Sequence, residues 1–129
     1  MGGESARSAE VKVSDPPAVL RVLNRDVITM RVPLVGSGPE VRVQRAAERL
    51  SELRPREVMD APLHTEPLQL GGARGVQIML GDRLLFAVLE GDVDPTIGQT
   101  HDALVKQTLA NLEEVRQVWL ETRRPAVAL

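Results

Sequence analysis

The alternation of apolar and polar residues predicts a β-hairpin at the start of the folded chain. Apolar positions fall on alternate residues from 18 to 23, and residues 27–34 continue the same period of two. Asn24 and Arg25 lie between the two runs. Such alternation around an Asn-containing turn is typical of half-buried strands, so we expect a hairpin here.

A helical period follows from Pro39 to Leu53, because apolar residues recur there three and four positions apart. The apolar positions are Val43, Ala46, Ala47, Leu50 and Leu53. The charged residues Arg42, Arg45, Glu48, Arg49 and Glu52 cover the other side. We expect an amphipathic helix that begins at Pro39, ends before Pro55 and exposes its charged side to water.

The middle of the chain predicts a connector and three strands. Residues 55–62 contain two prolines and form the connector, and Pro67 limits a strand at 63–70 to the edge of a sheet. Residues 71–75 are glycine-rich and form a turn. Residues 76–81 and 83–90 form a second hairpin, closed by a Gly-Asp pair that suits a type II′ turn.

The second strand of that hairpin is apolar on both faces over residues 84–89. An antiparallel strand with one face in water would alternate, so we expect a central strand that is covered on both sides. The alternative is that one face, formed by Leu85, Ala87 and Leu89, contacts another subunit.

The longest periodic segment runs from Thr100 to about Arg123 and predicts a helix. Its apolar stripe consists of Leu104, Thr108, Leu112, Val115 and Trp119. The element order is therefore β-β-α-β-β-β-α, which predicts an α+β fold with an antiparallel sheet and two helices packed on one face.

The chain predicts one domain over residues 17–124. Residues 1–16 are polar and are expected to be a disordered leader or an expression remnant. Residues 125–129 are apolar and could begin a membrane segment of a longer parent protein, although a frayed end is the simpler interpretation. No segment has the roughly 18–20 consecutive apolar residues of a membrane span.

Composition excludes several classes of function. The net charge is -2, with 16 basic and 18 acidic residues, whereas a nucleic-acid surface would be basic and concentrated. The aromatic residues are Phe86 and Trp119, too few for a platform that stacks bases or sugars. The absence of cysteine excludes disulfides and thiolate metal sites.

Candidate chemistry is sparse. Glu90, Asp92 and Asp94 are two residues apart, but a calcium loop would need glycine and glutamate where the chain has Pro95 and His101. We interpret these acids as a solvated turn before a helix N-terminus. His64 has no second His or Cys nearby to complete a metal set, and no serine has a nucleophile-elbow context. We therefore expect no catalytic, cofactor-binding or metal-binding residues, and no enzyme activity.

Four blocks carry a resemblance to a known family. They are residues 24–31, the helix at 43–53, residues 75–86, and residues 91–100 with Gly91-Asp-Val-Asp-Pro95 and Gly98-Gln-Thr100. In this order they resemble the soluble N-terminal region that precedes the membrane helices in a subset of bacterial mechanosensitive ion channels of the small-conductance family. The resemblance spans roughly residues 18–124 and rests on hairpin and turn residues.

The resemblance implies a non-enzymatic extracytoplasmic domain that regulates or assembles a mechanosensitive-type ion channel at the periplasmic face of a bacterial inner membrane. The implied partners are the rest of the parent channel and other subunits of a homo-oligomer, with membrane contact only through the parent. The alternative is a free-standing cytoplasmic protein-interaction module. A small hydrolase or metal enzyme is the third and weakest hypothesis.

Overall fold

The computed structural model describes residues 15–123 of the chain. The predicted tail at 125–129 and all of the predicted leader except Asp15 and Pro16 lie outside the described residues. The elements are β1 (Ala18–Val22), β2 (Arg25–Met30), α2 (Pro39–Ser51), α3 (Pro55–Asp60), β3 (Leu63–Leu70), β4 (Ala73–Leu80), β5 (Arg83–Leu89), the 3₁₀ turns η1 (Glu90–Asp92) and η2 (Pro95–Ile97), and α4 (His101–Thr122). The predicted α+β class is confirmed.

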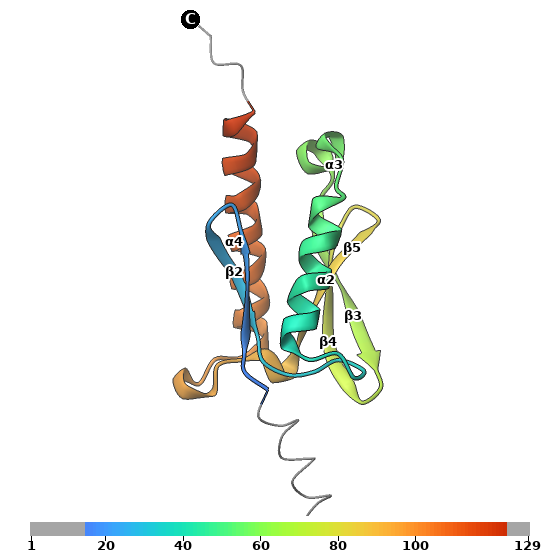
Figure 1. The fold of residues 1–129 in the computed structure, drawn as a ribbon, viewed down its shortest axis with the longest axis vertical. Coiled ribbons are helices and arrows are strands. Elements are labelled where there is room, and N and C mark those ends of the chain that lie inside the picture. The colour runs from blue at the N-terminus through green and yellow to red at the C-terminus, as the bar shows by residue number, and fades with distance from the viewer. Residues whose placement is uncertain (1–14, 124–129) are drawn as a thin grey trace, which may run out of the picture.

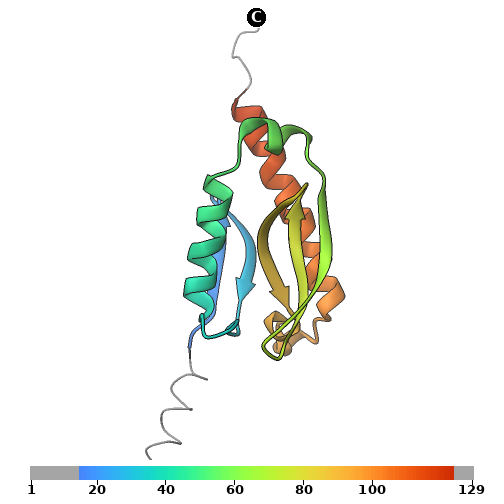
Figure 2. The same cartoon turned by 90° about the vertical axis from the view of Figure 1, so that its right-hand side faces the viewer.

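The strands form two antiparallel sheets, where the sequence predicts one. β1 pairs with β2, and the second sheet has the order β3-β4-β5. The two sheets lie next to each other, as Figure 2 shows, without a hydrogen-bonded ladder between β2 and β5. Pro67 lies in β3 at the edge of the second sheet, which confirms the position predicted for that strand.

The two long helices each pack against both sheets. α2 contacts β1 and β5, whereas α4 contacts β2, β4 and β5 (Figure 1). Because the sheet is divided, the helices do not share one face of a single sheet as predicted. The buried apolar side chains of both sheets and both helices form one core, with Ala46 from α2 and Leu104, Val105, Leu112 and Val115 from α4.

β5 lies at an edge of its sheet, so the expectation of a central strand is wrong, but both of its faces are covered. Leu85, Phe86, Val88 and Leu89 are all buried. Side chains also occupy its open edge. The carbonyls of Leu85 and Ala87 accept hydrogen bonds from Arg49 and Arg42 of α2. An edge covered in this way cannot template pairing with another chain.

The first hairpin turns one residue earlier than predicted. Leu23 and Asn24 form the turn with φ of 51° and 65°, and Arg25 already belongs to β2. Asn tolerates this left-handed conformation, whereas a leucine there is sterically unfavourable. Leu23 is also 46% exposed, so its side chain gains only partial burial in return.

α3 falls in the segment predicted as a connector. Pro55 occupies the first turn, and the Glu57 carboxylate accepts from the backbone amide of Arg54 at 2.9 Å. Arg83 of β5 donates to Glu57 at 2.7 Å, which holds the pKa of that carboxyl below its usual value. A six-residue helix has too few periodic positions to be distinguished from a proline-rich loop by pattern alone.

The predicted long helix is confirmed by α4. The Thr100 hydroxyl accepts from the amide of Ala103 and caps its N-terminus. Leu104, Thr108, Leu112 and Val115 of the predicted stripe are buried. None of the helices within residues 15–123 combines the length and the apolar run that a membrane crossing needs.

Gly75 marks the closest backbone approach in the second sheet, and this approach predicts a large effect of substitution. A Cβ at Gly75 would lie 2.2 Å from the Val88 carbonyl oxygen and 2.8 Å from the Leu89 Cα. Gly75→Ala therefore forces β4 and β5 apart and is expected to lower the free energy of unfolding by about 3 kcal/mol.

The matched control is Gly72→Ala, because no atom lies within 4 Å of the position of the new methyl group and only the φ of 83° opposes it. We expect this control to cost about 1 kcal/mol. Urea denaturation of both variants measures the two costs, and a larger loss in the Gly72 variant would contradict the proposed clash.

Candidate functional site

The most deeply buried charges of the described chain form an ion pair between Arg42 of α2 and Asp92 of η1. Arg42 is 6% exposed and Asp92 is 1% exposed. The guanidinium donates from Nη1 to Asp92 Oδ1 at 2.9 Å and from Nη2 to Oδ2 at 2.8 Å. This is the bidentate geometry in which a guanidinium and a carboxylate interact most strongly.

The Asp92 carboxylate also binds the backbone where both sheets end. Oδ1 accepts from the amides of Arg31 at 2.8 Å and Val32 at 3.4 Å, and Oδ2 accepts from the amide of Leu89 at 2.9 Å. β2 ends at Met30, earlier than the sequence predicts, because the next two amides donate to Asp92.

Arg42 connects the segment after β2 to β5 through carbonyl groups. It donates to the Val32 carbonyl at 2.6 Å and to the Ala87 carbonyl at 3.0 Å. Within residues 15–123, no buried side-chain nitrogen or oxygen lacks a hydrogen-bond partner. Both charges are therefore fully occupied with holding the fold, and neither is available to bind a substrate.

These contacts correct two expectations. Asp92 does not belong to a solvated acidic turn, and Arg42 does not lie on a solvated helix face. Asp92 lies two residues from other acids, and Arg42 lies among charged neighbours. Neither sequence pattern distinguishes a solvated side chain from a buried one. The two residues are 50 positions apart in the sequence, so no local pattern indicates that they pair.

The other two acids of the turn behave differently from Asp92. Glu90 is exposed. Asp94 accepts hydrogen bonds from the hydroxyl and the amide of Thr96, which lower the pKa of its carboxyl. Asp94 also lies 3.7 Å from the guanidinium of Arg31. Asp94 caps η2, which agrees with the interpretation of this acid as part of a turn before a helix.

The two histidines lie on different elements and each donates to a backbone carbonyl. His64 Nε2 is 2.8 Å from the Gly81 oxygen, and His101 Nε2 is 3.0 Å from the Val88 oxygen. Within the described residues, no three His, Cys, Asp or Glu side chains come together as a metal site would require.

The proposed interface residues on β5 are largely inside the domain. Leu85 and Leu89 are buried, and Ala87 is half-buried with its carbonyl bonded to Arg42. A contact with another subunit through this face stays a prediction.

An apolar pocket lies between the ends of α2 and α4, and we call it the α2–α4 pocket. Its volume is about 280 Å³. Eleven of its thirteen lining residues are apolar. They are Val22, Leu23, Leu50, Leu53, Val58, Leu63, Leu80, Leu85, Leu112, Val115 and Trp119, and Ser51 and Arg116 complete the lining.

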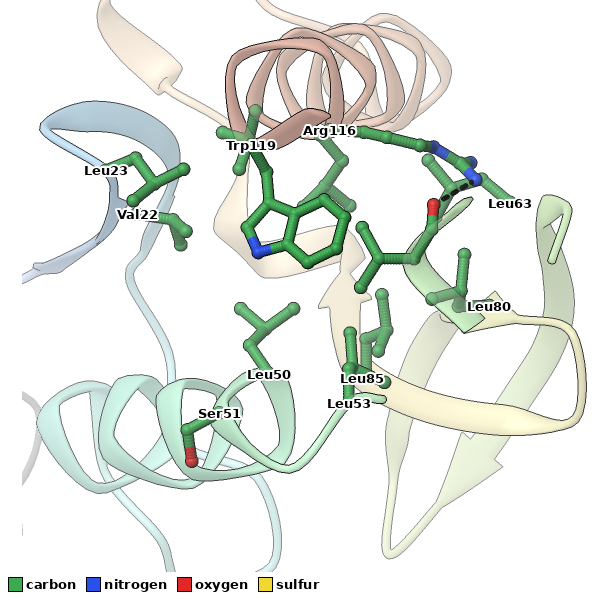
Figure 3. A pocket seen from close by; sticks show the side chains of 13 residues that line it. Val22, Leu23, Leu50, Ser51, Leu53, Leu63, Leu80, Leu85, Arg116 and Trp119 are labelled. Atoms are coloured by element: carbon green, nitrogen blue, oxygen red, sulfur yellow. Dashed lines mark hydrogen bonds between the residues drawn. The ribbon is translucent and has the colours of Figure 1, made fainter. Parts of the chain in front are cut away.

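Figure 3 shows the pocket from close by, with α4 above it, α2 below it, the β1–β2 hairpin at the left and strands of the second sheet at the right. The indole of Trp119 points from α4 toward Leu50 of α2. Arg116 donates to the carbonyls of Val58 at 3.0 Å and Ala61 at 2.8 Å, which attaches the α3 segment to α4 beside the pocket.

The pocket offers mainly apolar contact. Among the described residues its lining includes no histidine or carboxylate, and its one hydroxyl, that of Ser51, donates to the Glu48 carbonyl at 2.7 Å. The lining therefore fits the binding of an apolar group better than a reaction. The apolar stripes of both helices predict the lining residues Leu50, Leu53, Leu112, Val115 and Trp119 as core. Only the tertiary arrangement leaves a space between them.

The chain belongs to the family described as a domain of unknown function, DUF8459, whose model matches residues 18–118. This stretch includes every strand and α2, α3 and most of α4. No characterised protein and no solved structure shows a match to the chain.

The buried ion pair predicts that removing Arg42 is severe. Arg42→Met leaves the Asp92 charge buried without its counter-ion, so we expect the free energy of unfolding to fall by about 3–5 kcal/mol. Chemical denaturation followed by circular dichroism measures the loss.

Arg45→Met is the matched control, since Arg45 lies on the same helix, is exposed and, among residues 15–123, donates only to the Ser37 hydroxyl. We expect this control to change stability by less than about 0.5 kcal/mol. Equal effects of the two substitutions would show that the ion pair does not hold the fold together.

Proposed function

We propose that this chain is a non-enzymatic extracytoplasmic domain of a bacterial mechanosensitive-type ion channel, located at the periplasmic face of the inner membrane. It regulates gating or assembly through packing contacts and performs no reaction. The proposal rests on the resemblance of four sequence blocks. It is supported by the positions that their residues take in the structure.

The resembling residues are those that specify the fold. Asn24 forms the β1–β2 turn with positive φ, and Gly81 forms the β4–β5 turn with φ of 58°. Asp92 connects both sheets, Gly98 ends η2 with φ of 64°, and Thr100 caps α4. A match that consists of turn, cap and ion-pair residues is what a shared fold produces, which favours a common architecture with those channel domains.

The attachment of α4 is the observation that carries a mechanical role. Asn111 donates to the Val27 carbonyl of β2 at 2.9 Å, and Arg116 binds the carbonyls before and after the end of α3. Leu112 and Val115 between them are buried in the common core. Helix α4 is thus attached to β2 and to the α3 segment. A displacement of the end of α4 is therefore transmitted to the rest of the domain, and a displacement of the domain is transmitted to α4.

The partners of this function are the rest of the parent channel and other subunits of its homo-oligomer. In this proposal α4 transmits the position of the domain to the first membrane helix of the parent. The face of β5 that carries Leu85, Ala87 and Leu89 serves packing, and a subunit contact uses exposed surface near it.

A free-standing cytoplasmic interaction module is the second candidate, and the α2–α4 pocket favours it because apolar binding needs no membrane attachment. The complete reading frame discriminates the two. Apolar membrane spans encoded after Leu129 support the channel domain, and a stop codon there supports the free-standing module.

The channel proposal predicts that the domain changes tension sensitivity. In the parent channel, we expect deletion of residues 18–124 to shift the tension that opens half of the channels, measured by patch clamp in spheroplasts. Native gel electrophoresis of the same variant reports assembly.

The control is a ten-residue Gly-Ser linker inserted after Arg123, which keeps the domain but uncouples α4 from the following helix. A regulatory role predicts that both variants shift the threshold, whereas an assembly role predicts a defect in the deletion alone. Unchanged gating and unchanged oligomerisation in both variants would refute the proposed function.

A further inference from the structure

We propose that the α2–α4 pocket is a binding site for a small anionic amphiphile, a molecule with one aliphatic tail and an acidic head such as a medium-chain carboxylate. The tail occupies the pocket, and the head contacts Arg123 beside its wall. This inference does not depend on the proposed channel function.

The interior of the pocket suits an aliphatic tail. Its volume of about 280 Å³ is close to the lower end of the range for ligand pockets and well above the ~150 Å³ of an engineered apolar cavity that holds benzene. Leucine and valine side chains from α2, α4 and both sheets line it, so a flexible methylene chain finds apolar contact on every side.

The polar groups of the wall leave the interior without a site for a buried charge. The Arg116 guanidinium is bonded to the carbonyls of Val58 and Ala61 and to the carboxylate of Glu113. Ser51, the remaining polar residue of the lining, is exposed. A ligand with a polar group along its tail would lose hydration without compensation, so the pocket selects an uninterrupted tail.

A cation lies beside the wall of the pocket. The Arg123 guanidinium lies 4.6 Å from the centre of the Trp119 ring, and that ring forms part of the pocket wall. Arg123 itself is exposed. A carboxylate whose tail passes the indole therefore reaches a positive charge at the water boundary, where it keeps most of its hydration. This charge complementarity favours an anionic amphiphile over a neutral apolar ligand.

Leu23 adds a second unusual feature at this site. It lines the pocket, it is half-exposed, and it keeps a positive φ that a leucine rarely adopts. Asn or Gly would form the same turn with less strain. A large apolar side chain at this position extends the wall of the pocket toward solvent. A bound tail would gain contact with this side chain, which would offset the strain of the positive φ.

Trp119 makes the proposal directly measurable, because it is the only tryptophan of the chain and lies in the pocket wall. We expect decanoate, added below its micelle-forming concentration, to shift the emission of Trp119 with saturable 1:1 binding. A decanoate brominated at its far end is expected to quench the same emission, since the tail lies against the indole.

A series of chain lengths tests the volume of the pocket. Between hexanoate and decanoate the dissociation constant should fall about fourfold per added methylene, and longer chains should gain less once the pocket is full. A steady gain through tetradecanoate, or binding that does not saturate, would mean nonspecific adsorption and overturn the proposal.

Two variant pairs test the tail and the head separately. Leu50→Phe fills the pocket and should weaken decanoate binding more than tenfold, whereas Val41→Phe, on the same helix and outside the pocket, should not. Arg123→Gln should weaken decanoate about fivefold and leave decanol unchanged. Circular dichroism establishes that each variant is folded.

The remaining outcomes would overturn the proposal. Equal affinity for decanoate and decanol, together with no effect of Arg123→Gln, would show that the head is not recognised. Trp119 emission that responds to protein concentration and not to decanoate would instead indicate that a second copy of the chain fills the pocket, which sedimentation velocity would detect as a dimer.

Discussion

The structure depends on one buried ion pair, because the two sheets share no ladder. Asp92 accepts backbone amides that follow β2 and one at the end of β5, and Arg42 donates to carbonyls from the same two segments. A carboxylate with three amide donors and a bidentate arginine is satisfied in every direction, so its burial is tolerated. The hairpin and the three-stranded sheet are positioned relative to each other at this point, and α2 is fixed to both.

The ion pair also explains why the domain has room for a pocket. It closes the space between the sheets at the end where β2 and β5 stop, and Arg49 continues that contact along β5. Toward the opposite end, near the β1–β2 turn, α2 and α4 contribute Leu50 and Trp119 on opposite sides of the remaining space. The fold is thus held by a buried ion pair at one end and lined mainly by apolar side chains at the other.

This division has consequences for function. The buried polar side chains of residues 15–123 all have hydrogen-bond partners. What this part of the chain offers to a partner is therefore surface, a firmly attached helix and an apolar pocket. Membership in a family described only as a domain of unknown function agrees with any of these uses. The channel hypothesis depends on α4, and the amphiphile hypothesis depends on the α2–α4 pocket. The two hypotheses are therefore independent of each other.

The sequence by itself determined the strands, the two long helices and the α+β class, because those depend on local periodicity and on residues such as Pro39, Pro67 and Thr100 that act within a few positions. It could not reveal that the sheet is divided, that Arg42 and Asp92 are buried, or that Leu50 and Trp119 face a pocket. Each of these depends on partners far away in the chain. A charge has the same local pattern whether it is solvated or paired, and only tertiary packing decides between the two.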